Sequence, residues 1–519
     1  MQDASLANRT ARPTEGTSVN WRKANRQVRN LRQRIFRATQ EGDWDKVQSL
    51  QRLMLRSYAN TLVSVRRVTQ VNQGQRTAGV DKLVVKTPER RGQLVDHLMT
   101  FQPWRARPAK RGYIPKANGK LRPLGIPTII DRCLQARVKN ALEPCWEGHG
   151  PFPARELIRQ WLKAGYVERG VWHATESGTG QGAVVSPLLA SIALHGLETA
   201  LGIVRNARGH IKGPRTVIRY ADDFVVFCET KDDATRVIAL LTDWLGERGL
   251  ALSADKTRIV HLTEGFDFLG FTVRRYAAPC TRTGYKLLIT PSAESVKRLR
   301  TRLRAEWRAL AGQPAGAIVK RLNPLIRGWA NYFRIGVATK TFSRLDHWMV
   351  TRELRYVQRK HPRKSHVWRK ARYWDKHNRR KGDTWVFGDK QTGAYLLLFR
   401  WFKIERHILV RGTASPDDPR LREYWTRRRA AQAKDLRPSL QKIAKNQSYV
   451  CSVCGETLFN DEEIHTHHLE PRAQGGRDGY TNLALTHLYC HQQIHSRATG
   501  ITGHPTHVPT RQGSRPWLA

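Results

Sequence analysis

Two adjacent carboxylates, Asp222 and Asp223, interrupt an apolar, β-branched stretch, Val217-Ile-Arg-Tyr-Ala-Asp-Asp-Phe-Val-Val-Phe227. The hydrophobic residues on both sides predict a strand, a tight turn and a second strand, with the acids at the tip. Paired carboxylates in this position can hold divalent metal ions for in-line phosphoryl transfer. The alternative is a solvated acidic turn, because aspartate is common in turns.

Four residues near the C-terminus, Cys451, Cys454, His487 and Cys490, are spaced as two close pairs of metal ligands. Two such pairs predict a closed tetrahedral zinc site that holds a small domain together. We assign His487 to this set because the Cys-x-x-Cys pair needs two further ligands. His487 also lies one helical turn before His491, so an exchange between two metal sites stays open.

A second set of histidines overlaps the first and consists of His467, His468, His491 and His495. The last two are separated by one helical turn, so on a helix they share a face. A purely structural zinc finger, using the same cysteines and any histidine, is the alternative. That alternative does not account for the ordered run of His467-His468, Pro471, Gly475-Gly476, Asn482 and His-x-x-x-His.

The charge of the chain predicts a polyanionic partner. With 91 Lys and Arg against 43 Asp and Glu, the net charge is +48, and such self-repulsion disfavours a compact free state. Residues 291–440 hold 37 basic and 12 acidic residues, with eight of the sixteen tryptophans. Arginine and aromatic rings suit the phosphates and unpaired bases of structured RNA better than duplex DNA. The alternative is a basic surface over an aromatic core.

Composition also limits the classes of protein to which this chain can belong. The sequence contains no run of eighteen or more apolar residues, so we expect no membrane span. The N-terminus lacks the apolar core of a secretory signal. Seven cysteines in 519 residues do not make a disulfide scaffold. We therefore expect several domains with real cores, in the reducing cytoplasm.

The elements that must position these residues follow from the hydrophobic pattern. Residues 21–65 have apolar side chains at helical spacing, with a break at Glu41-Gly42-Asp43. Asn118-Gly119 predicts a hairpin turn, and Asp131 begins a predicted helix. Further expected elements are a helix over 157–166, a glycine-rich loop over 178–187 that enters a helix, an amphipathic helix over 234–245, strand-and-turn elements over 250–257 and 265–271, and mainly basic helices over 291–380.

Several stretches, in the right order, resemble those of group II intron-encoded proteins, which combine a reverse transcriptase–maturase with a C-terminal HNH nuclease. The matching stretches are Tyr113-Ile-Pro-Lys through Arg122-Pro-Leu-Gly-Ile-Pro127, Gln181-Gly through Ser186-Pro-Leu-Leu-Ala190, Tyr220-Ala-Asp-Asp223, Leu252-Ser through Lys256-Thr257, Phe268-Leu-Gly270 and Leu322-Asn-Pro-Leu-Ile-Arg-Gly-Trp-Ala-Asn-Tyr332. The resemblance covers residues 20 to 497.

This resemblance implies an α+β multidomain protein with right-hand fingers and palm, a helical thumb or maturase domain, and a small ββα-metal HNH domain. The expected parts are a disordered tail (1–19), an N-terminal helical extension (20–100), fingers and palm (101–290), thumb or maturase domain (291–400), basic connector (401–443), HNH domain with structural zinc (444–497) and a second tail (498–519). Nucleic-acid contacts are expected from Lys116, Arg122, Gln181, Lys256, Arg327 and Trp329.

One part of the family pattern is missing from the palm. The strand that carries the first catalytic aspartate belongs between Glu143 and Leu157, where about a dozen residues remain, and no aspartate lies between Asp131 and Asp222. Two-metal catalysis needs carboxylates on both sides of ions about 3.5–4 Å apart. Neither of the nearest acids, Glu147 and Glu156, has a strand-like context, and Gly180 and Ala183 also depart from the family's nucleotide loop. We therefore expect a palm truncated near 145–157, with an exposed edge beside the acidic hairpin and no DNA synthesis.

For the C-terminal module, the resemblance implies that His467, His491 and His495 bind a catalytic divalent ion, Mg or Mn. It further implies that His468 activates water and that Asn482 braces the loop presenting it. An imidazole near its ordinary pKa of about 6.5 is a competent general base at cellular pH. A nuclease remnant that folds but no longer cuts remains an alternative.

The preferred function is a maturase that binds group II intron RNA, assists splicing and nicks target DNA in the bacterial nucleoid, with possible homodimers. A second hypothesis keeps an active polymerase, with Mg at Asp222 and Asp223 and a carboxylate from elsewhere. A third is a catalytically dead RNA-binding protein, and a fourth is the product of a decaying gene that does not fold.

Overall fold

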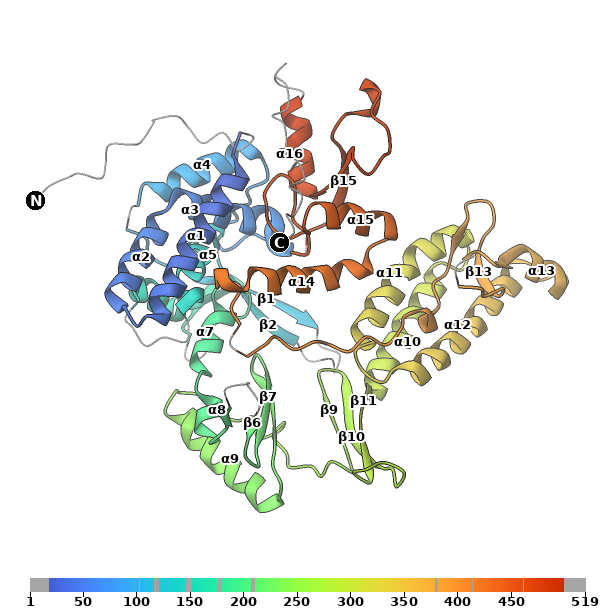
Figure 1. The fold of residues 1–519 in the computed structure, drawn as a ribbon, viewed down its shortest axis with the longest axis horizontal. Coiled ribbons are helices and arrows are strands. Elements are labelled where there is room, and N and C mark those ends of the chain that lie inside the picture. The colour runs from blue at the N-terminus through green and yellow to red at the C-terminus, as the bar shows by residue number, and fades with distance from the viewer. Residues whose placement is uncertain are drawn as a thin grey trace, which may run out of the picture. The chain divides into compact units, whose positions relative to one another are not determined.

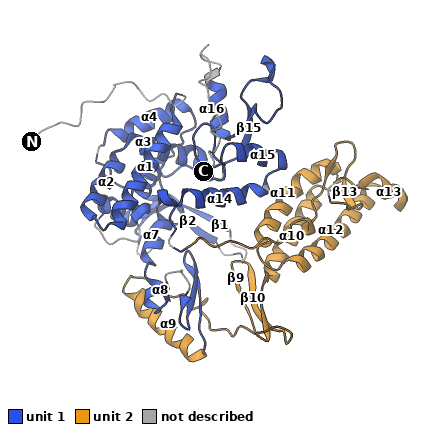
Figure 2. Cartoon of the chain, viewed as in Figure 1, with its two compact units in different colours: residues 1–229, 412–519 blue, residues 230–411 orange. Residues whose placement is uncertain are grey.

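The computed structural model describes residues 18–101, 103–115, 119, 121–145, 152–175, 180–206, 211–378, 381–412, 414–460 and 462–498. The helices and small sheets confirm the α+β multidomain class (Figure 1). Two compact units are present, one from residues 1–229 with 412–519 and one from residues 230–411 (Figure 2). Most of the two predicted tails lies outside the described residues.

Helices with apolar faces begin the first unit: α1 (Trp21–Gln40), α2 (Trp44–Arg56), α3 (Tyr58–Arg66), α4 (Pro88–Met99) and α5 (Ile129–Leu142). The predicted break is present, because α1 ends at Gln40 and the Asp43 side chain caps α2 by accepting from the Lys46 N–H at 3.1 Å. A π-helical turn (Arg67–Val71) and a 3-10 turn (Gln73–Arg76) follow α3. Ile35, Met54 and Ile129 are fully buried in the shared core.

A four-stranded sheet with the order β2-β1-β3-β4 follows the helices. The predicted hairpin is present as antiparallel β1 (Ala109–Pro115) and β2 (Leu121–Ile126), although Asn118 lies outside the described residues. Strand β3 (Tyr166–Glu168) runs parallel to β1 and pairs with β4 (Val171–His173). Between and after these strands lie a 3-10 turn (Glu143–Cys145), α6 (Arg155–Lys163), α7 (Ser186–Ala193), α8 (Leu197–Ala200), β5 (Val204–Arg205) and β6 (Ile211–Lys212).

The acidic hairpin forms as predicted, with β7 (Thr216–Tyr220) antiparallel to β8 (Asp223–Phe227). Ala221, in the turn, has a φ of 54°, which lies in the left-handed region that non-glycine residues rarely adopt. Within the described residues this sheet contains only these two strands. Ile218 and Tyr220 are 52% and 64% exposed, as expected for a hairpin without a neighbouring strand.

The C-terminal part of the first unit contains two connector helices and a ββα element (Figure 1). Its elements are a 3-10 turn (Pro419–Leu421), α14 (Arg422–Gln432), a 3-10 turn (Ala433–Asp435), α15 (Pro438–Asn446), β15 (Ile464–His468), a 3-10 turn (Arg472–Gln474), β16 (Leu483–His487) and α16 (Leu488–Ala498). Strands β15 and β16 pair antiparallel, and α16 follows β16 directly. This confirms the small ββα fold that the sequence predicts.

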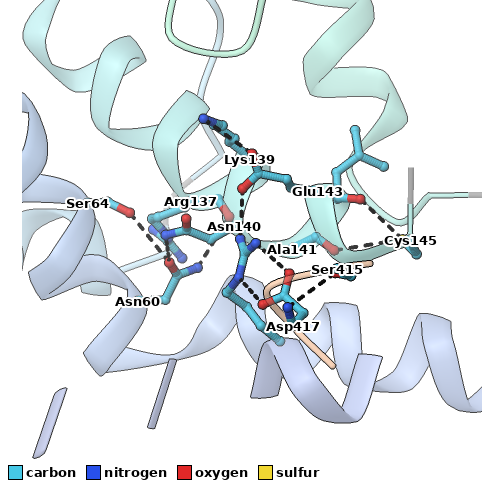
Figure 3. A network of polar contacts seen from close by, with 12 residues as sticks. Asn60, Ser64, Arg137, Lys139, Asn140, Ala141, Glu143, Cys145, Ser415 and Asp417 are labelled. Atoms are coloured by element: carbon cyan, nitrogen blue, oxygen red, sulfur yellow. Dashed lines mark hydrogen bonds and ion pairs between the residues drawn. The ribbon is translucent and has the colours of Figure 1, made fainter. Parts of the chain in front are cut away.

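Buried ion pairs tie this C-terminal part to the N-terminal helices, as Figure 3 shows for the segment before α14. Arg32 of α1 donates through Nε and Nη2 to the two oxygens of Asp417, at 2.9 and 2.7 Å, and through Nη1 to Glu143 at 3.0 Å. The side chains of Arg32 and Asp417 are only 15% and 9% exposed. The connector is thus held by charges far apart in sequence.

The second unit has a large helical core. It contains α9 (Lys231–Gly246), β9 (Phe266–Phe268), β10 (Phe271–Ala277), β11 (Tyr285–Pro291), α10 (Ala293–Ala309), α11 (Ala315–Phe333), α12 (Thr339–Lys360), α13 (His366–Tyr373), β12 (Trp374–Asp375), β13 (Val386–Asp389), β14 (Ala394–Tyr395) and a 3-10 turn (Phe399–Trp401). Leu322, Ile326 and Phe399 are fully buried in it. The strand expected over 250–257 is wrong, because that stretch contains a turn and no strand.

Candidate metal centres and palm carboxylates

The cysteine cluster has the chemistry of a closed zinc site. Cys451, Cys454, His487 and Cys490 are buried, and their ligand atoms all lie within 4.8 Å of one another. His487 Nδ1 lies 3.4 Å from Cys454 Sγ, and His487 Nε2 lies 3.0 Å from the Thr457 carbonyl. With Nε2 protonated and donating to that carbonyl, Nδ1 is free to bind a metal, as in outer-shell support of zinc histidines. The donor set therefore fits tetrahedral zinc.

The assignment of His487 to the cysteines agrees with this geometry. Burial tends to lower its pKa, but the adjacent Cys451 and Cys490 thiolates raise the pKa of His487 to about 10. The negative charge of the thiolates thus stabilises a positive charge at the cluster. A divalent cation supplies that charge and leaves the imidazole neutral.

A second group of ligands is formed by His467 on β15 with His491 and His495 on α16. The Nε2 atoms of His491 and His495 are 3.3 Å apart. Burial and the neighbouring imidazoles lower the pKa of His467 to about 4 and also lower the pKa of His491. Neutral imidazoles are the metal-binding form. Three ligands with open coordination positions fit a catalytic rather than a structural ion.

His468 is outside this three-histidine group and has a carboxylate partner instead. Its Nε2 lies 2.7 Å from Asp478 Oδ1, and Arg472 donates to both oxygens of Asp478, at 2.8 and 2.6 Å. A proton on Nε2 leaves Nδ1 as the basic nitrogen that can accept a proton from water. Sequence reasoning missed Asp478 and Arg472. The signal in the sequence was the pair of opposite charges, Arg472 and Asp478, on either side of Gly475-Gly476.

Asn482 closes the loop between the two strands. Its Oδ1 accepts from the Glu470 N–H at 2.7 Å, and its Nδ2 donates to the Glu470 and Arg477 carbonyls, both at 3.0 Å. These bonds hold the loop that carries Asp478 opposite His468. These bonds are consistent in geometry with bracing by Asn482, and the role of Asn482 in presenting His468 stays a prediction.

The palm carboxylates lack such support. Asp222 and Asp223 are exposed, and neither belongs to a metal-holding group of three or more ligands within the described residues. Asp131 is buried and accepts hydrogen bonds from Trp104 and Trp161 at 2.7 and 3.0 Å. Its carboxylate therefore has a structural role. Glu156 is exposed, and Glu147 lies outside the described residues.

A cavity of about 710 Å³ lies beside the glycine-rich loop. Arg107, Arg111, Trp161, Gly180 and Gln181 are among its lining residues, and neither palm aspartate lines it among the described residues. A basic, aromatic-lined cavity of this kind suits a nucleotide or an unpaired base. Arg122 lies on β2 and is exposed, whereas Lys116 lies outside the described residues.

The remaining predicted nucleic-acid contacts lie in the second unit. Lys256, in a turn, and Arg327, on α11, are exposed. Trp329 is half-buried and packs on Phe333 and Phe399, with ring centroids 4.3 and 5.8 Å apart. Much of that ring belongs to the core, so its contact with RNA stays a prediction.

A cluster of arginines on α10 and α12 was not singled out from the sequence. It comprises Arg300, Arg304 and Arg308 of α10 with Arg352 and Arg355 of α12. Burial and then the four like charges lower the pKa of Arg352. Arg300 and Arg352 both stack on Trp348, at 5.2 and 5.0 Å from its ring centroid. Positive charge at this density favours phosphate binding.

None of the helices in the described part of the chain is both long and apolar enough to span a membrane.

Comparison with protein families accounts for most of the chain in four consecutive parts. The matching descriptions are the N-terminal domain of reverse transcriptase (residues 17–98), reverse transcriptase or RNA-dependent DNA polymerase (148–273), the group II intron maturase-specific domain (296–374) and HNH endonuclease (451–497).

The individual relatives are 22–28% identical to this chain over the aligned residues. Protein YkfC of Escherichia coli is 28% identical over 328 residues, 44% of this chain and 84% of YkfC. Group II intron-encoded protein LtrA of Lactococcus lactis subsp. cremoris is 26% identical over 291 residues, 34% of this chain and 49% of LtrA, so the match spans about half of that relative. Maturase-like protein 1 of Euglena gracilis is 22% identical over 370 residues, 60% of this chain and 76% of that protein. The four domain matches in this order show reverse transcriptase, group II intron maturase and HNH endonuclease domains in one chain, and together with the similarity to LtrA they support a group II intron-encoded protein.

Proposed function

We propose that this protein is a maturase that binds group II intron RNA and assists its splicing, and that its HNH domain nicks target DNA during intron mobility. We further propose that it no longer synthesises DNA. The observation that carries this proposal is a contrast between two sites. The HNH domain has three grouped histidines and a carboxylate-held His468, whereas Asp222 and Asp223 have no third ligand among the described residues.

The proposed nicking reaction follows from the position of His468. Its Nδ1 takes a proton from water, and the water oxygen forms a bond to the DNA phosphorus while the bond from phosphorus to the leaving oxygen breaks. Asp478 keeps the proton on Nε2 and stabilises the imidazolium that forms. A Mg or Mn ion held by His467, His491 and His495 supplies charge stabilisation at the phosphate and leaving oxygen when bound.

The cysteine cluster has a different proposed role. Its four buried ligands leave no open position for substrate, so a zinc ion there would stabilise the domain without taking part in the chemistry. Cys451 and Cys454 are contributed before β15, whereas His487 and Cys490 come from β16 and α16. Such a zinc would therefore fasten both ends of the ββα element together.

For intron RNA, the arginine cluster on α10 and α12 is the proposed surface. Replacing Arg300, Arg304 and Arg352 together by alanine should weaken RNA binding at low salt and reduce the salt dependence of log K by about one for each lost phosphate contact. The measurement is filter binding of intron RNA at several salt concentrations. Arg52→Ala, an exposed arginine on α2, is the control. An unchanged slope for the triple variant would remove this surface from the proposal.

The alternative of an active reverse transcriptase needs a further carboxylate, which the described residues do not supply beside Asp222. We place the protein in the bacterial nucleoid because intron RNA and target DNA are both found there.

A further inference from the structure

Arg66, at the end of α3, is the one arginine of the described N-terminal helices that donates to a sulfur of the cysteine cluster. Its Nη2 lies 3.0 Å from Cys490 Sγ and 3.5 Å from a carboxylate oxygen of Glu462. The side chains of Arg66 and Glu462 are 8% and 5% exposed. The Arg66 guanidinium also stacks on Trp21 of α1, 4.8 Å from the ring centroid.

The charges around the cluster explain why a cation belongs at this position. Three thiolates and a neutral histidine around a divalent ion carry a net charge of −1, and the buried Glu462 carboxylate adds a second negative charge nearby. His487 Nδ1 is 3.8 Å from Glu462. A buried charge without a partner is strongly destabilising. Arg66 is positioned to neutralise the metal centre from outside its ligand shell, as outer-shell groups do in other metal sites.

Further contacts join the same two parts of the first unit. Asn25 donates to the Cys454 carbonyl at 3.1 Å, and Gln75 donates to the Tyr489 hydroxyl at 3.1 Å. The Trp21 side chain packs against both the N-terminal core and the core of the cysteine cluster. The residues that flank the metal ligands are therefore anchored on α1 and on the turns after α3.

We propose that the N-terminal helical domain completes the zinc centre of the HNH domain, with Arg66 as a positioning residue that sets how tightly the metal is held. The nuclease is then not an independent module, because its metal centre depends on a side chain 424 residues away in sequence. This inference rests on the proposed zinc at the cysteine cluster.

The test is zinc retention by the full-length protein. Zinc content is measured by mass spectrometry, and zinc release to a chromogenic chelator is followed for wild type, Arg66→Ala, Arg66→Lys and Arg29→Ala. Arg29 is the matched control because it lies at the same junction and pairs with Glu456, but both side chains are about half exposed and neither touches a ligand sulfur. Arg66→Ala should hold zinc about 10- to 100-fold less tightly, Arg66→Lys should lie between, and Arg29→Ala should resemble wild type.

A variant of opposite sign separates the charge effect from a general loss of stability. Glu462→Gln removes one negative charge beside the centre, while its side-chain oxygen can still accept the hydrogen bond from Asn460. It should hold zinc as tightly as wild type or more tightly. Reduced zinc retention in both Arg66→Ala and Glu462→Gln, or unchanged retention in Arg66→Ala, would overturn the inference. A wild-type protein without zinc would instead overturn the proposed metal itself.

Discussion

Replacing Asp478 should slow DNA nicking without unfolding the HNH domain. The carboxylate is 2.7 Å from His468 Nε2 and is the acceptor that selects the ring tautomer. Its side chain is 60% exposed, so water can partly replace it. Loss of the buried carboxylate that orients a catalytic histidine costs up to about 10⁴-fold in activity, and the exposure of Asp478 places Asp478→Ala far below that limit, at about tenfold.

The nicking rates of two further variants can be compared with that of Asp478→Ala. His468→Ala removes the proton acceptor itself, for which a loss of about 10²- to 10⁴-fold is expected. Asp478→Asn keeps an oxygen that can accept from Nε2 but loses the negative charge, so it should be slowed less than Asp478→Ala. The order of rates should therefore be wild type, Asp478→Asn, Asp478→Ala and His468→Ala.

Single-turnover nicking of supercoiled plasmid in Mg²⁺ or Mn²⁺ measures these rates. Zinc content and circular dichroism confirm that each variant is folded, and Asp45→Ala, an exposed aspartate on α2, is the control. A rate for Asp478→Ala within twofold of wild type, with His468→Ala inactive, would refute the tautomer argument. A loss as large as that of His468→Ala would show that the carboxylate does more than orient the ring.

The remaining predictions concern buried charges. Asp417→Ala leaves Arg32 paired with Glu143 alone, and it should lower the free energy of unfolding in urea by about 3 kcal/mol. The exposed Arg29→Ala should cost less than about 1 kcal/mol, and equal effects would contradict the burial argument. Burial raises the pKa of Glu353 to about 7, so the folded state binds more protons and the second unit should lose stability as pH rises from about 4.5 to 7. Glu353→Gln should raise the thermal transition at pH 8 but not at pH 4.5, and an equal shift at both values would refute this sign.

The features of the fold and of the metal sites that the sequence predicts are those that depend on short spacings between residues. The helix break at residues 41–43, the acidic hairpin and the ligand pairs Cys451-Cys454 and His487-Cys490 all depend on neighbours close in the chain. Pair spacing is enough there because strands and helices place such residues side by side.

Contacts between the N-terminal helices and the C-terminal part were not predicted. Arg66 meets Cys490, and Arg32 meets Asp417, only after the C-terminal part packs on the N-terminal helices. Asp478 approaches His468 because Asn482 closes the loop between them. A single sequence contains no local pattern for such pairs. The strand expected over 250–257 does not form, and this stretch pairs with no strand of the described sheets.

We propose that the reverse-transcriptase domain no longer polymerises while the HNH domain still cuts. Primer extension on a primed RNA template, with Asp222→Ala/Asp223→Ala as control and nicking assayed on the same preparation, tests it most directly. We expect nicking without primer extension, from protein shown to be folded. Extension that disappears in the double variant would contradict the claim, because another carboxylate would then complete the metal site of the palm.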